Sequence, residues 1–568
     1  MSDVQNNLQR WLKSKNLSKK IKDEIRAMSQ AEVDDAFFTT LSFGTAGMRG
    51  VLGWGTNRLN IFTLRKACVG FALYVLDNVS GAAERGVVIA RDNRHQGYEF
   101  QEECVKVLNA YGIKAYVFNS LRPTPELSFA VRYFEAAGGI MLTASHNPKE
   151  YNGFKVYDEF GCQLVPYKAN RLLSIISNLP EEIDIKVPKG KSKQRIKAKT
   201  KIDNDYLKLV RKIQLRPKME KKDFKIVFTP QHGTSYVNAM KLFEQLGYQV
   251  YPVMSQIAPD PDFSGTISPN PEDPRSFIKS IEYAKQIEAQ LIVMTDPDGD
   301  RVGLAFLNKS GEYCLVNGNI SAAILLDYIL QSRKEKTKTL RGSVVYSTIV
   351  SSGIGKKICD SYKVEYGAFL TGFKYIGNQI QLDIENNGPK FLFGYEESYG
   401  CLLAPFVRDK DGIQAIMMYC EMALYYHHKK MDLDDAYTDL QERMGYYLDT
   451  CYSLEFKGAK GAEEMQRIMK KLQSAPIERV GSREVKVYED YKNLISYNIS
   501  KRCSESIISD TSDVIRIVFK DGCSICVRPS GTEPKCKFYI GITAATKNDT
   551  LNKDVELFEE LKKILGIY

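Results

Sequence analysis

The chain has 568 residues and a formal net charge of +10, with 43% hydrophobic and 26% charged residues. A chain of this length is too long to fold around a single hydrophobic core, so three or four domains are predicted. The composition excludes a fibrous or disordered chain, and the modest positive charge favours anionic ligands without indicating a nucleic-acid-binding protein.

The first residues predict a helix with one apolar face. Leu8, Trp11 and Leu12 are spaced to lie together on that face, within an otherwise polar segment. Such a start is neither a signal peptide nor a membrane anchor. The longest apolar tract, residues 416–426, contains Glu421 and is too short to span a bilayer. We therefore expect no membrane partner.

The cysteine pattern indicates free thiols. The twelve cysteines are scattered, and the pair Cys523 and Cys526 has no second CxxC motif with which to form a zinc site. Scattered thiols are typical of proteins in reducing compartments, so we expect a cytoplasmic location.

Three segments repeat one pattern of strand, polar loop, amphipathic helix and second strand. The paired strand regions are 86–97 with 113–118, 225–235 with 248–253, and 343–353 with 363–369. The intervening helices are expected to run through Val105 to Tyr111, Met240 to Leu246, and Ile358 to Tyr362. Strands that alternate with helices at this spacing predict βαβ units and largely parallel sheets.

A further apolar strand follows each of these units and ends in an unusual loop. The loops are TASHNP at 143–148, TDPDGD at 295–300 and GYEES at 394–398. In doubly wound sheets, ligands bind at the carboxyl ends of the strands, so three related domains are expected to direct these loops towards one cleft. The repetition indicates an internal triplication.

The last part of the chain, from about Met444, lacks the repeat. It shows strand-like alternation at 514–519 and 524–527, and a terminal helix. The predicted fold is α/β, with three related α/β domains at 1–205, 206–322 and 323–443 and a C-terminal α+β domain at 444–568. The basic run Lys186 to Lys201 has no interleaved aromatic residues, which favours a solvated linker or loop over a nucleic-acid patch.

Alternating carboxylates after an apolar strand predict a cation site. Asp296, Asp298 and Asp300 place three oxygen ligands on one side of a turn, and Gly299 permits the bend. An EF-hand is excluded, because its sixth position is Arg301 and its twelfth is Leu307. The ion expected from these ligands is Mg²⁺.

Ser145 is the candidate nucleophile. It lies in the loop after the apolar run 140–142, where small neighbours leave its hydroxyl accessible. No GxSxG motif is present, which argues against an α/β-hydrolase triad. A phosphate on Ser145 would complete the coordination of a cation held by the aspartates.

Two later loops suit a phosphorylated sugar. Arg528, Ser530, Gly531 and Thr532 offer a guanidinium, two hydroxyls and a flexible backbone for a phosphate monoester. The loop 394–398 places two carboxylates and a hydroxyl at a strand end, as sugar hydroxyls require. Paired carboxylates for glycoside hydrolysis are disfavoured there, because adjacent side chains on a strand point to opposite faces.

Together, TASHNP, DPDGDR, GYEES and RPSGTEP, in this order, resemble the loops of the α-D-phosphohexomutase superfamily, most closely its phosphoglucomutase and phosphomannomutase branch. The resemblance runs from the segment at 43–50 to the last loop, nearly the whole chain. It implies a heart-shaped enzyme of four domains, with the phosphate carried on Ser145 and Mg²⁺ bound by Asp296, Asp298, Asp300 and a phosphoserine oxygen.

The resemblance also assigns roles to other positions. It implies that Arg49 and Lys155 are active-site cations and that Lys155 and His146 are candidates for proton transfer. Lys155 is equally explained as a counter-charge to phosphate, and His146 is better explained as a group that orients the loop. Further substrate-binding positions implied by the resemblance are Arg301, Thr371, Gly372, Lys374, Glu396, Ser398, Arg528, Ser530, Gly531 and Thr532.

The implied reaction is ping-pong transfer between two ends of one sugar, from glucose 1-phosphate to glucose 6-phosphate and back. Glucose 1,6-bisphosphate would be the intermediate and activator, and sugar phosphates the small-molecule partners, with the protein a monomer or dimer. Mannose and pentose phosphates remain alternative substrates, because pocket contacts separate similar sugars by small free energies. A protein of another class, a non-catalytic regulator that binds sugar phosphates, is the competing hypothesis. Residues 1–42 lie outside the motifs and have no assigned role.

Overall fold

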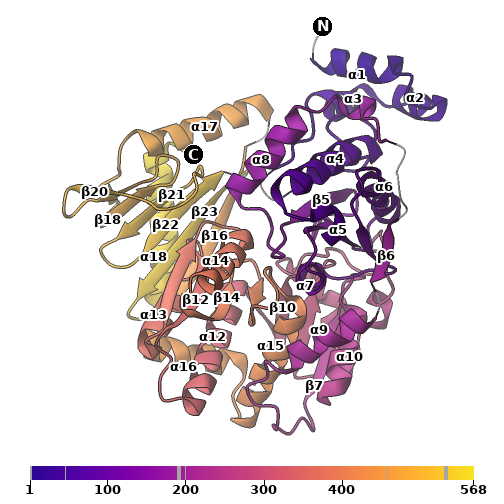
Figure 1. Cartoon of the computed structure of the whole chain (residues 1–568). Coiled ribbons are helices and arrows are strands. Elements are labelled where there is room, and N and C mark those ends of the chain that lie inside the picture. Colours follow the sequence, from indigo (N-terminus) through magenta and orange to yellow (C-terminus); the bar gives the residue numbers. More distant parts are fainter. Residues whose placement is uncertain are drawn as a thin grey trace. The chain divides into compact units, whose positions relative to one another are not determined.

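A computed structural model describes residues 3–44, 47–188, 194–198, 200–456, 458–529 and 535–567. The chain forms two compact units (Figure 1). The first comprises Met1–Asn317, Phe373–Gly394 and Ser398–Lys430, and the second comprises Gly318–Gly372, Tyr395–Glu397 and Met431–Tyr568.

The first unit begins with three short helices, α1 (Asp3–Lys13), α2 (Lys19–Arg26) and α3 (Gln30–Phe37). The predicted apolar face of the first helix is confirmed by Trp11, which is fully buried and meets Phe37 and Phe62 edge to face. Ser29 and Glu32 form a capping box at the start of α3. These helices therefore have a small core of their own against the domain that follows.

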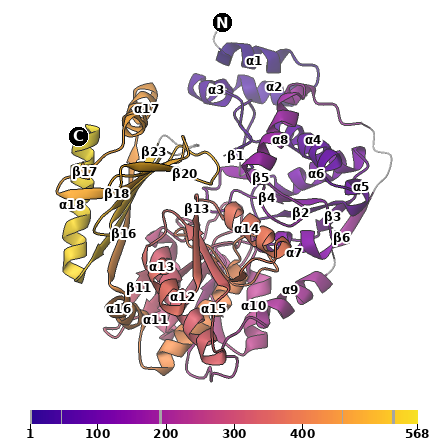
Figure 2. The same cartoon turned by 60° about the vertical axis from the view of Figure 1, so that its left-hand side comes forward.

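The next element of the first unit is a six-stranded sheet of order β1-β5-β4-β2-β3-β6. Strands β2, β3, β4 and β6 run parallel, while β5 and β1 are antiparallel at one edge. Its elements are β1 (Met48–Val51), α4 (Ile61–Asn78), α5 (Ala82–Arg85), β2 (Val87–Arg91), α6 (Gly97–Ala110), β3 (Ala115–Phe118), α7 (Thr124–Tyr133), β4 (Gly138–Leu142), β5 (Tyr151–Tyr157), α8 (Pro166–Ser177), η1 (Glu182–Asp184) and β6 (Arg195–Ala198). Figure 2 shows α4, α6 and α8 on one side of this sheet and α7 on the other.

A five-stranded sheet of order β11-β10-β9-β7-β8 follows in the same unit. Strands β9, β7 and β8 are parallel, and β10 and β11 are antiparallel. Its elements are α9 (Lys201–Arg211), β7 (Lys225–Thr229), α10 (Tyr236–Leu246), β8 (Gln249–Pro252), η2 (Met254–Gln256), η3 (Pro274–Phe277), α11 (Ile278–Ile287), β9 (Leu291–Thr295), β10 (Val302–Leu307) and β11 (Tyr313–Val316). Helix α15 (Gly412–His428) packs on β9 and β10, and the first unit also holds α14 (Phe373–Glu385), β15 (Cys401–Leu402) and most of β14 (Lys390–Tyr395).

The second unit contains the third repeat and the C-terminal domain. The repeat comprises α12 (Gly318–Lys336), β12 (Ser343–Thr348), α13 (Ile354–Tyr362), β13 (Glu365–Phe369) and α16 (Leu433–Met444), with β12 parallel to β13. The C-terminal sheet is antiparallel, in the order β16-β23-β22-β21-β18-β19-β20. Its elements are β16 (Tyr446–Glu455), α17 (Gly458–Ser474), β17 (Arg479–Val480), β18 (Arg483–Asp490), β19 (Ile495–Asn498), β20 (Cys503–Ser506), β21 (Ile515–Phe519), β22 (Ser524–Pro529), β23 (Lys535–Ala544) and α18 (Lys547–Leu565).

These elements confirm the predicted fold class. All three strand, helix and strand units are present, and the first two sheets share one order, β4-β2-β3 and β9-β7-β8. The helices begin earlier than the apolar periodicity showed, at Gly97, Tyr236 and Ile354, because their first turns are polar or lie at a loop. The final segment forms the expected α+β domain, in which α18 packs on β23 and β16.

The basic run differs from its predicted form. Within Lys186 to Lys201, Arg195–Ala198 form the edge strand β6, parallel to β3, where a linker or loop was expected. Alternation of Arg195, Ile196, Lys197 and Ala198 supports a strand, and cationic side chains at an edge discourage pairing with another chain. The neighbouring residues 189–193 and 199 lie outside the described part of the chain.

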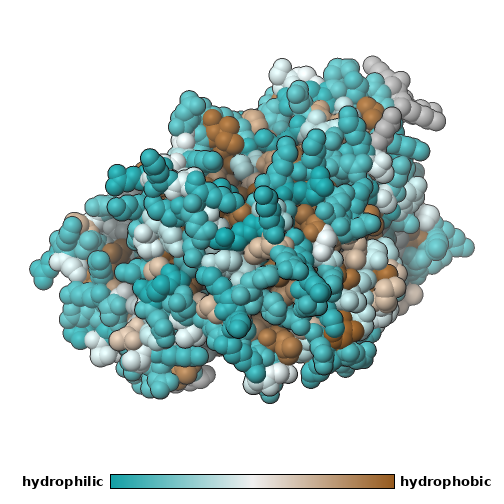
Figure 3. Space-filling view, turned by 90° about the horizontal axis from the view of Figure 1, so that it is seen from below, coloured by the Kyte–Doolittle hydropathy of each residue, from teal (hydrophilic) through white to brown (hydrophobic). Residues whose placement is uncertain are grey.

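One face of the molecule is largely polar (Figure 3). On the face shown in Figure 3, hydrophilic residues predominate and hydrophobic residues form small separate patches. Among the described residues, no helix combines the length and apolarity needed to cross a membrane.

Candidate active site

Ser145 lies in the tight loop that follows β4. Its backbone has φ 53°, in the left-handed region that a non-glycine residue seldom adopts. The loop is held because Thr143 Oγ1 accepts the Ser145 N–H at 2.8 Å and donates to Asp92 Oδ2 at 2.5 Å. Ser145 is 3% exposed, and its Oγ donates to Asp296 Oδ2 at 2.8 Å. The predicted nucleophile and the first predicted metal ligand are therefore in direct contact.

Arg94, which the sequence did not single out, holds the rest of this loop. Its buried guanidinium lies 3.3 Å from Asp92 Oδ2. Its donors bind four backbone carbonyls, those of Ser145 at 2.7 Å, Asn147 at 2.5 Å, Pro148 at 2.7 Å and Tyr151 at 2.8 Å. A planar guanidinium suits this task, because it presents five donors in fixed directions.

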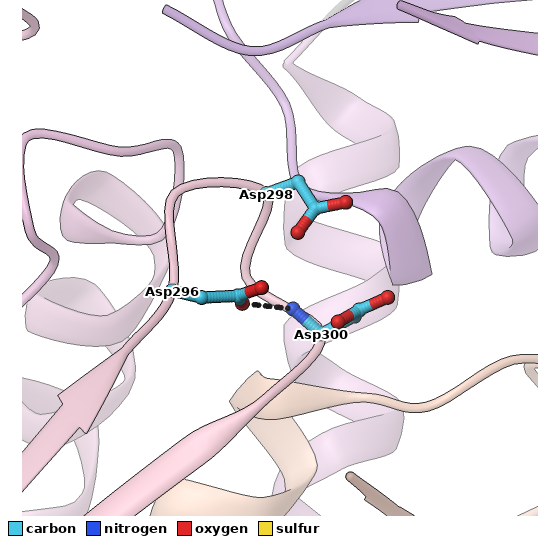
Figure 4. Close-up of side chains that lie close together, drawn as sticks. All are labelled: Asp296, Asp298 and Asp300. Carbon is cyan, nitrogen blue, oxygen red and sulfur yellow. Dashed lines mark hydrogen bonds between the residues drawn. The ribbon is translucent and has the colours of Figure 1, made fainter. Parts of the chain in front are cut away.

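The three aspartates converge in the loop between β9 and β10 (Figure 4). Gly299, at φ 70°, makes the turn, and Asp296 Oδ1 accepts the N–H groups of Asp300 and Arg301 at 3.1 Å each. All three side chains are at most 2% exposed, and one oxygen from each lies within 4.8 Å of the others. The sequence prediction of a convergent carboxylate cluster is thus confirmed.

This cluster fits a hard divalent cation. Asp298 Oδ1 and Asp300 Oδ1 are buried and accept no hydrogen bond within the described residues. Burial raises the pKa of Asp296, and the carboxylates of Asp298 and Asp300 raise it further. Mg²⁺ and Ca²⁺ bind crowded oxygen ligands that lack hydrogen-bond donors. A bound cation would offset the repulsion between these carboxylates.

Two lysines border the aspartates. Lys155, on β5, donates to Asp298 Oδ2 at 2.8 Å and lies 4.0 Å from Asp300 Oδ2. Burial opposes ionisation of Asp298, but the Lys155 ammonium outweighs it and holds the pKa of Asp298 well below its usual range. Lys410, just before α15, lies 3.1 Å from Asp300 Oδ2 and 3.2 Å from Asp409 Oδ1. The sequence missed Lys410, although its setting in the charged stretch RDKDG between an apolar segment and a helix was a visible signal.

Three further predicted residues surround Ser145 and the aspartate loop. His146 Nδ1 lies 3.2 Å from Ser145 Oγ, and Arg49 donates to Asn147 Oδ1 at 2.7 Å. Burial, together with the guanidinium groups of Arg301 and Arg49, lowers the pKa of His146 well below its ordinary value, so its imidazole is neutral at pH 7. Arg301 itself pairs with Glu272 Oε1 at 2.6 Å.

Lys374 and Ser398 belong to the same unit as Ser145 and the aspartate loop. Lys374 lies at the start of α14, with its Nζ 5.2 Å from the centre of the Tyr375 ring. Ser398 precedes Tyr399, whose carbonyl accepts the Val302 N–H at 2.9 Å. Its loop is therefore tied to the start of β10, next to Arg301.

The remaining predicted residues lie in the second unit. Gly372 N–H donates to Glu396 Oε1 at 2.9 Å, which joins the segment of Thr371 and Gly372 to the predicted sugar loop. Glu397 accepts a hydrogen bond from Thr348 Oγ1 at 2.9 Å. Arg528 lies on β22 opposite Lys537. Ser530, Gly531 and Thr532 lie outside the described residues.

Parallel α/β sheets that place a buried serine hydroxyl against a carboxylate cage define an enzyme of the phosphoryl-transferring class. The family models for phosphoglucomutase/phosphomannomutase match the chain in sequence: domain I at 40–182, domain II at 204–309, domain III at 317–444 and the C-terminal domain at 457–556. The chain belongs to the phosphoglucomutase/phosphomannomutase family.

Curated relatives cover nearly the whole chain. A phosphoglucomutase of Staphylococcus epidermidis is 38% identical over 529 residues, covering 92% of this chain and 94% of its own. A phosphoglucomutase of Staphylococcus aureus is 37% identical over 548 residues, covering 96% and 97%. The chain thus spans almost the full length of these enzymes.

Solved structures show the same fold. The open form of parafusin, a phosphoglucomutase from Paramecium, matches with a TM-score of 0.66 at 18% identity, covering 93% of this chain and 96% of its own. A phosphoglucomutase/phosphomannomutase family protein from Burkholderia thailandensis matches with a TM-score of 0.65 at 18% identity, covering 92% and 97%.

Proposed function

We propose that this enzyme interconverts glucose 1-phosphate and glucose 6-phosphate through a phosphoserine at Ser145 and a glucose 1,6-bisphosphate intermediate. The observation that carries the proposal is the buried Ser145 hydroxyl in hydrogen-bond contact with the Asp296 carboxylate of the aspartate cluster. Relatives named phosphoglucomutase at 37% and 38% identity favour glucose over mannose or pentose phosphates.

In the first half of the proposed cycle, a free sugar hydroxyl attacks the phosphorus on Ser145. The new O–P bond forms as the P–Oγ bond breaks, the sugar hydroxyl loses its proton, and Ser145 Oγ gains one. Lys155 Nζ and His146 Nδ1, the latter 3.2 Å from Ser145 Oγ, are the two groups proposed for proton transfer. The neutral imidazole of His146 can accept the hydroxyl proton, and the Lys155 ammonium can donate to Oγ. In the second half, Ser145 Oγ attacks the phosphorus at the other end of the bisphosphate. The bond from that phosphorus to the sugar oxygen breaks, and the Oγ proton returns to the sugar oxygen, so Ser145 is again phosphorylated.

We propose that Asp296, Asp298, Asp300 and a phosphoserine oxygen hold Mg²⁺. When bound, the ion supplies electrostatic stabilisation to the transferring phosphoryl group. A fungal N-acetylphosphoglucosamine mutase of this fold, from Aspergillus fumigatus, has been solved with magnesium and GlcNAc-6P, with a TM-score of 0.51 at 13% identity. The orphaned oxygens of Asp298 and Asp300 support the same use here.

The other proposed roles concern substrate orientation. Arg49, Arg301 and Lys374 are proposed to bind phosphate or the sugar in one unit, and Thr371, Gly372, Glu396 and Ser398 to bind sugar hydroxyls. Arg528, Ser530, Gly531 and Thr532 are proposed to hold the phosphate that is not reacting, because both ends of one sugar must bind in turn. The domain boundaries after residues 205, 322 and 443 and a monomeric or dimeric state also remain proposals.

We place the enzyme in the cytoplasm. Its twelve cysteines are free thiols, a pattern favoured in reducing compartments. Sugar phosphates are its proposed partners, without nucleic acid or membrane.

The experiment that tests the proposal is Ser145→Ala, assayed with glucose 1-phosphate and a trace of glucose 1,6-bisphosphate. Loss of the phosphate carrier should reduce turnover at least about 1,000-fold. Phosphate labelling of the wild-type protein should place the label on Ser145. Ser310→Ala, in the exposed turn before β11, serves as the matched control and should behave as wild type. Near-normal turnover of Ser145→Ala would contradict the covalent mechanism, and absent turnover in wild type would favour a regulator.

A further inference from the structure

Thr124, the first residue of α7, ties that helix to the aspartate loop. Its Oγ1 donates to Asp298 Oδ2 at 3.0 Å, and its backbone N–H donates to the Asp298 carbonyl at 2.8 Å. This N–H is available because the first N–H groups of a helix have no acceptor within the helix, and Pro123 and Pro125 set the start of α7 here. The Thr124 side chain is fully buried. One residue therefore fixes both the backbone and the carboxylate of Asp298.

The two oxygens of Asp298 are held unequally. Oδ2 accepts from the Thr124 hydroxyl and, at 2.8 Å, from Lys155 Nζ. Oδ1 is buried and accepts no hydrogen bond from any described residue. The carboxylate is therefore oriented with one oxygen bound by protein donors and the other left to a cation.

The other two aspartates share this arrangement. Asp296 Oδ1 accepts two backbone N–H groups at 3.1 Å each, which leaves Oδ2, now the acceptor of the Ser145 hydroxyl. Asp300 Oδ2 pairs with Lys410 at 3.1 Å, while its buried Oδ1 accepts no hydrogen bond within the described residues. Each carboxylate thus offers a cation one oxygen.

One oxygen per carboxylate suits Mg²⁺ better than Ca²⁺. Mg²⁺ requires near-ideal octahedral geometry at about 2.0–2.1 Å, whereas Ca²⁺ takes more ligands at about 2.3–2.6 Å and often binds both oxygens of one carboxylate. Both ranges are shorter than the roughly 2.8 Å at which water approaches a carboxylate oxygen. A cation held between the three converging carboxylates can therefore bind oxygens that are closed to water.

We propose that Thr124 is a selectivity residue of this cation site. By donating to Asp298 Oδ2 beside Lys155, its hydroxyl keeps that oxygen from the cation and leaves Asp298 to bind through Oδ1 alone. Ca²⁺, which gains from two oxygens of one carboxylate, is thereby disfavoured relative to Mg²⁺. Thr124 acts through Asp298, so it is a positioning residue, and its role rests on the cation site of the proposed function.

The test measures cation preference without substrate. Mn²⁺ bound to the full chain is followed by electron paramagnetic resonance, and its displacement by Mg²⁺ or Ca²⁺ gives the two dissociation constants. Thr124→Val keeps the shape of the side chain but removes the donor. The ratio of the Ca²⁺ constant to the Mg²⁺ constant should fall at least about fivefold, because a hydrogen bond to a charged group is lost. Thr124→Ser, which keeps the hydroxyl, should retain the wild-type ratio. Intact mass confirms that the proteins compared carry the same amount of phosphate.

A matched control separates selectivity from packing. Thr56→Val removes another fully buried hydroxyl, which donates to the Thr39 carbonyl at 2.5 Å, and should leave the ratio at its wild-type value. Thr124→Ala replaces Thr124→Val if the latter does not fold, as judged by circular dichroism. An unchanged ratio in a folded variant without the Thr124 hydroxyl would overturn the proposal, even if both cations bound more weakly.

Failure of the proposed function would give a different result. A wild type that prefers Mg²⁺ but shows no mutase turnover would contradict the function, while the ratio in Thr124→Val would still decide the selectivity role. Normal turnover together with an unchanged ratio would overturn the selectivity role alone. Absence of Mn²⁺ binding to the wild type at millimolar concentration would overturn the cation site and the role of Thr124 with it.

Discussion

At the residue scale, the site is a cluster of buried carboxylates with fewer hydrogen-bond donors than acceptor oxygens. Ser145 Oγ, Lys155 Nζ and Lys410 Nζ each bind a different aspartate of the cluster. Two oxygens of that cluster still accept no hydrogen bond within the described chain. The charge of the three carboxylates is therefore only partly neutralised, and a bound divalent cation would neutralise the remainder.

Replacing one carboxylate of the cluster tests whether the cluster binds a cation. Asp298→Asn removes a full negative charge and leaves Lys155 facing a neutral amide. We expect Mg²⁺ affinity to fall at least about tenfold and turnover to fall further, because charge sets the affinity of hard cations. Titration with Mn²⁺ followed by electron paramagnetic resonance measures binding without activity.

Asp360→Asn, at an exposed ion pair with Lys356, is the matched control and should leave Mn²⁺ binding unchanged. Retained activity of the wild type in excess chelator would show that the proposed cation role is wrong.

Arg94 should act as a positioning residue for the serine loop. Lys at this position keeps the charge but cannot reach four carbonyls, so Ser145 would lose its fixed orientation. We expect Arg94→Lys to lower kcat at least about tenfold while KM changes less than about threefold. Arg65→Lys, whose partner is Glu103 on α6, should leave both constants near wild type. A large KM effect with normal kcat would instead indicate a substrate-binding role.

At the element scale, helix α15 links the aspartate loop to a segment more than a hundred residues away. A Cβ on Gly412, its first residue, would lie 2.4 Å from the Gly299 carbonyl oxygen, so only glycine permits this approach. The helix is capped by Asp411, whose Oδ1 accepts from the N–H groups of Ile413 and Gln414 at 3.0 Å each and from Tyr206 O–H at 2.7 Å.

This cap predicts a pH dependence of stability. Burial raises the pKa of Asp411 to about 6, above its unfolded value, so folding favours the protonated acid. The associated stability is present below about pH 4 and is lost as pH rises through about 6. Asp411→Asn keeps a hydrogen-bond acceptor and supplies an N–H near the unpaired Oδ2. Because the amide does not ionise, the free energy of unfolding of this variant should lack this decrease with rising pH, which amounts to up to about 3 kcal/mol.

Urea unfolding between pH 4 and pH 7 measures the effect. Tyr206→Phe removes a donor that stabilises the ionised acid and should enlarge the loss with rising pH. Parallel pH profiles for wild type and Asp411→Asn would contradict the assignment.

At the scale of the whole molecule, repetition explains why loops far apart in sequence carry one chemistry. Strands β4 and β9 hold equivalent places in two sheets of the same order, and each ends in a loop of the site. The N-terminal helices add a layer outside this repeat, anchored by Trp11 and by the hydrogen bond from its Nε1 to Glu182.

Loss of that anchor should destabilise the first unit. Trp11→Ala removes a fully buried aromatic side chain and should lower the free energy of unfolding by about 3–5 kcal/mol. Trp54, the other tryptophan of the chain, lies beside Phe62 and reports the transition by fluorescence. Phe38→Ala, at a residue 53% exposed, is the control and should change stability little. Equal stabilities of the two variants would show that α1 contributes no packing energy.

The sequence by itself determined the repeated βαβ units, the serine loop and the aspartate triplet. Each is encoded locally, by apolar periodicity, by small residues after a strand, or by alternate carboxylates around a glycine. Only the tertiary structure showed that the cationic side chains of Arg94 and Lys410 contact these loops. Arg94 binds carbonyls more than fifty residues away, and Lys410 reaches Asp300 from the start of another helix. Such contacts depend on how distant segments pack. The charged stretch around Lys410 could mark it as a candidate, but it could not identify Asp300 as its partner.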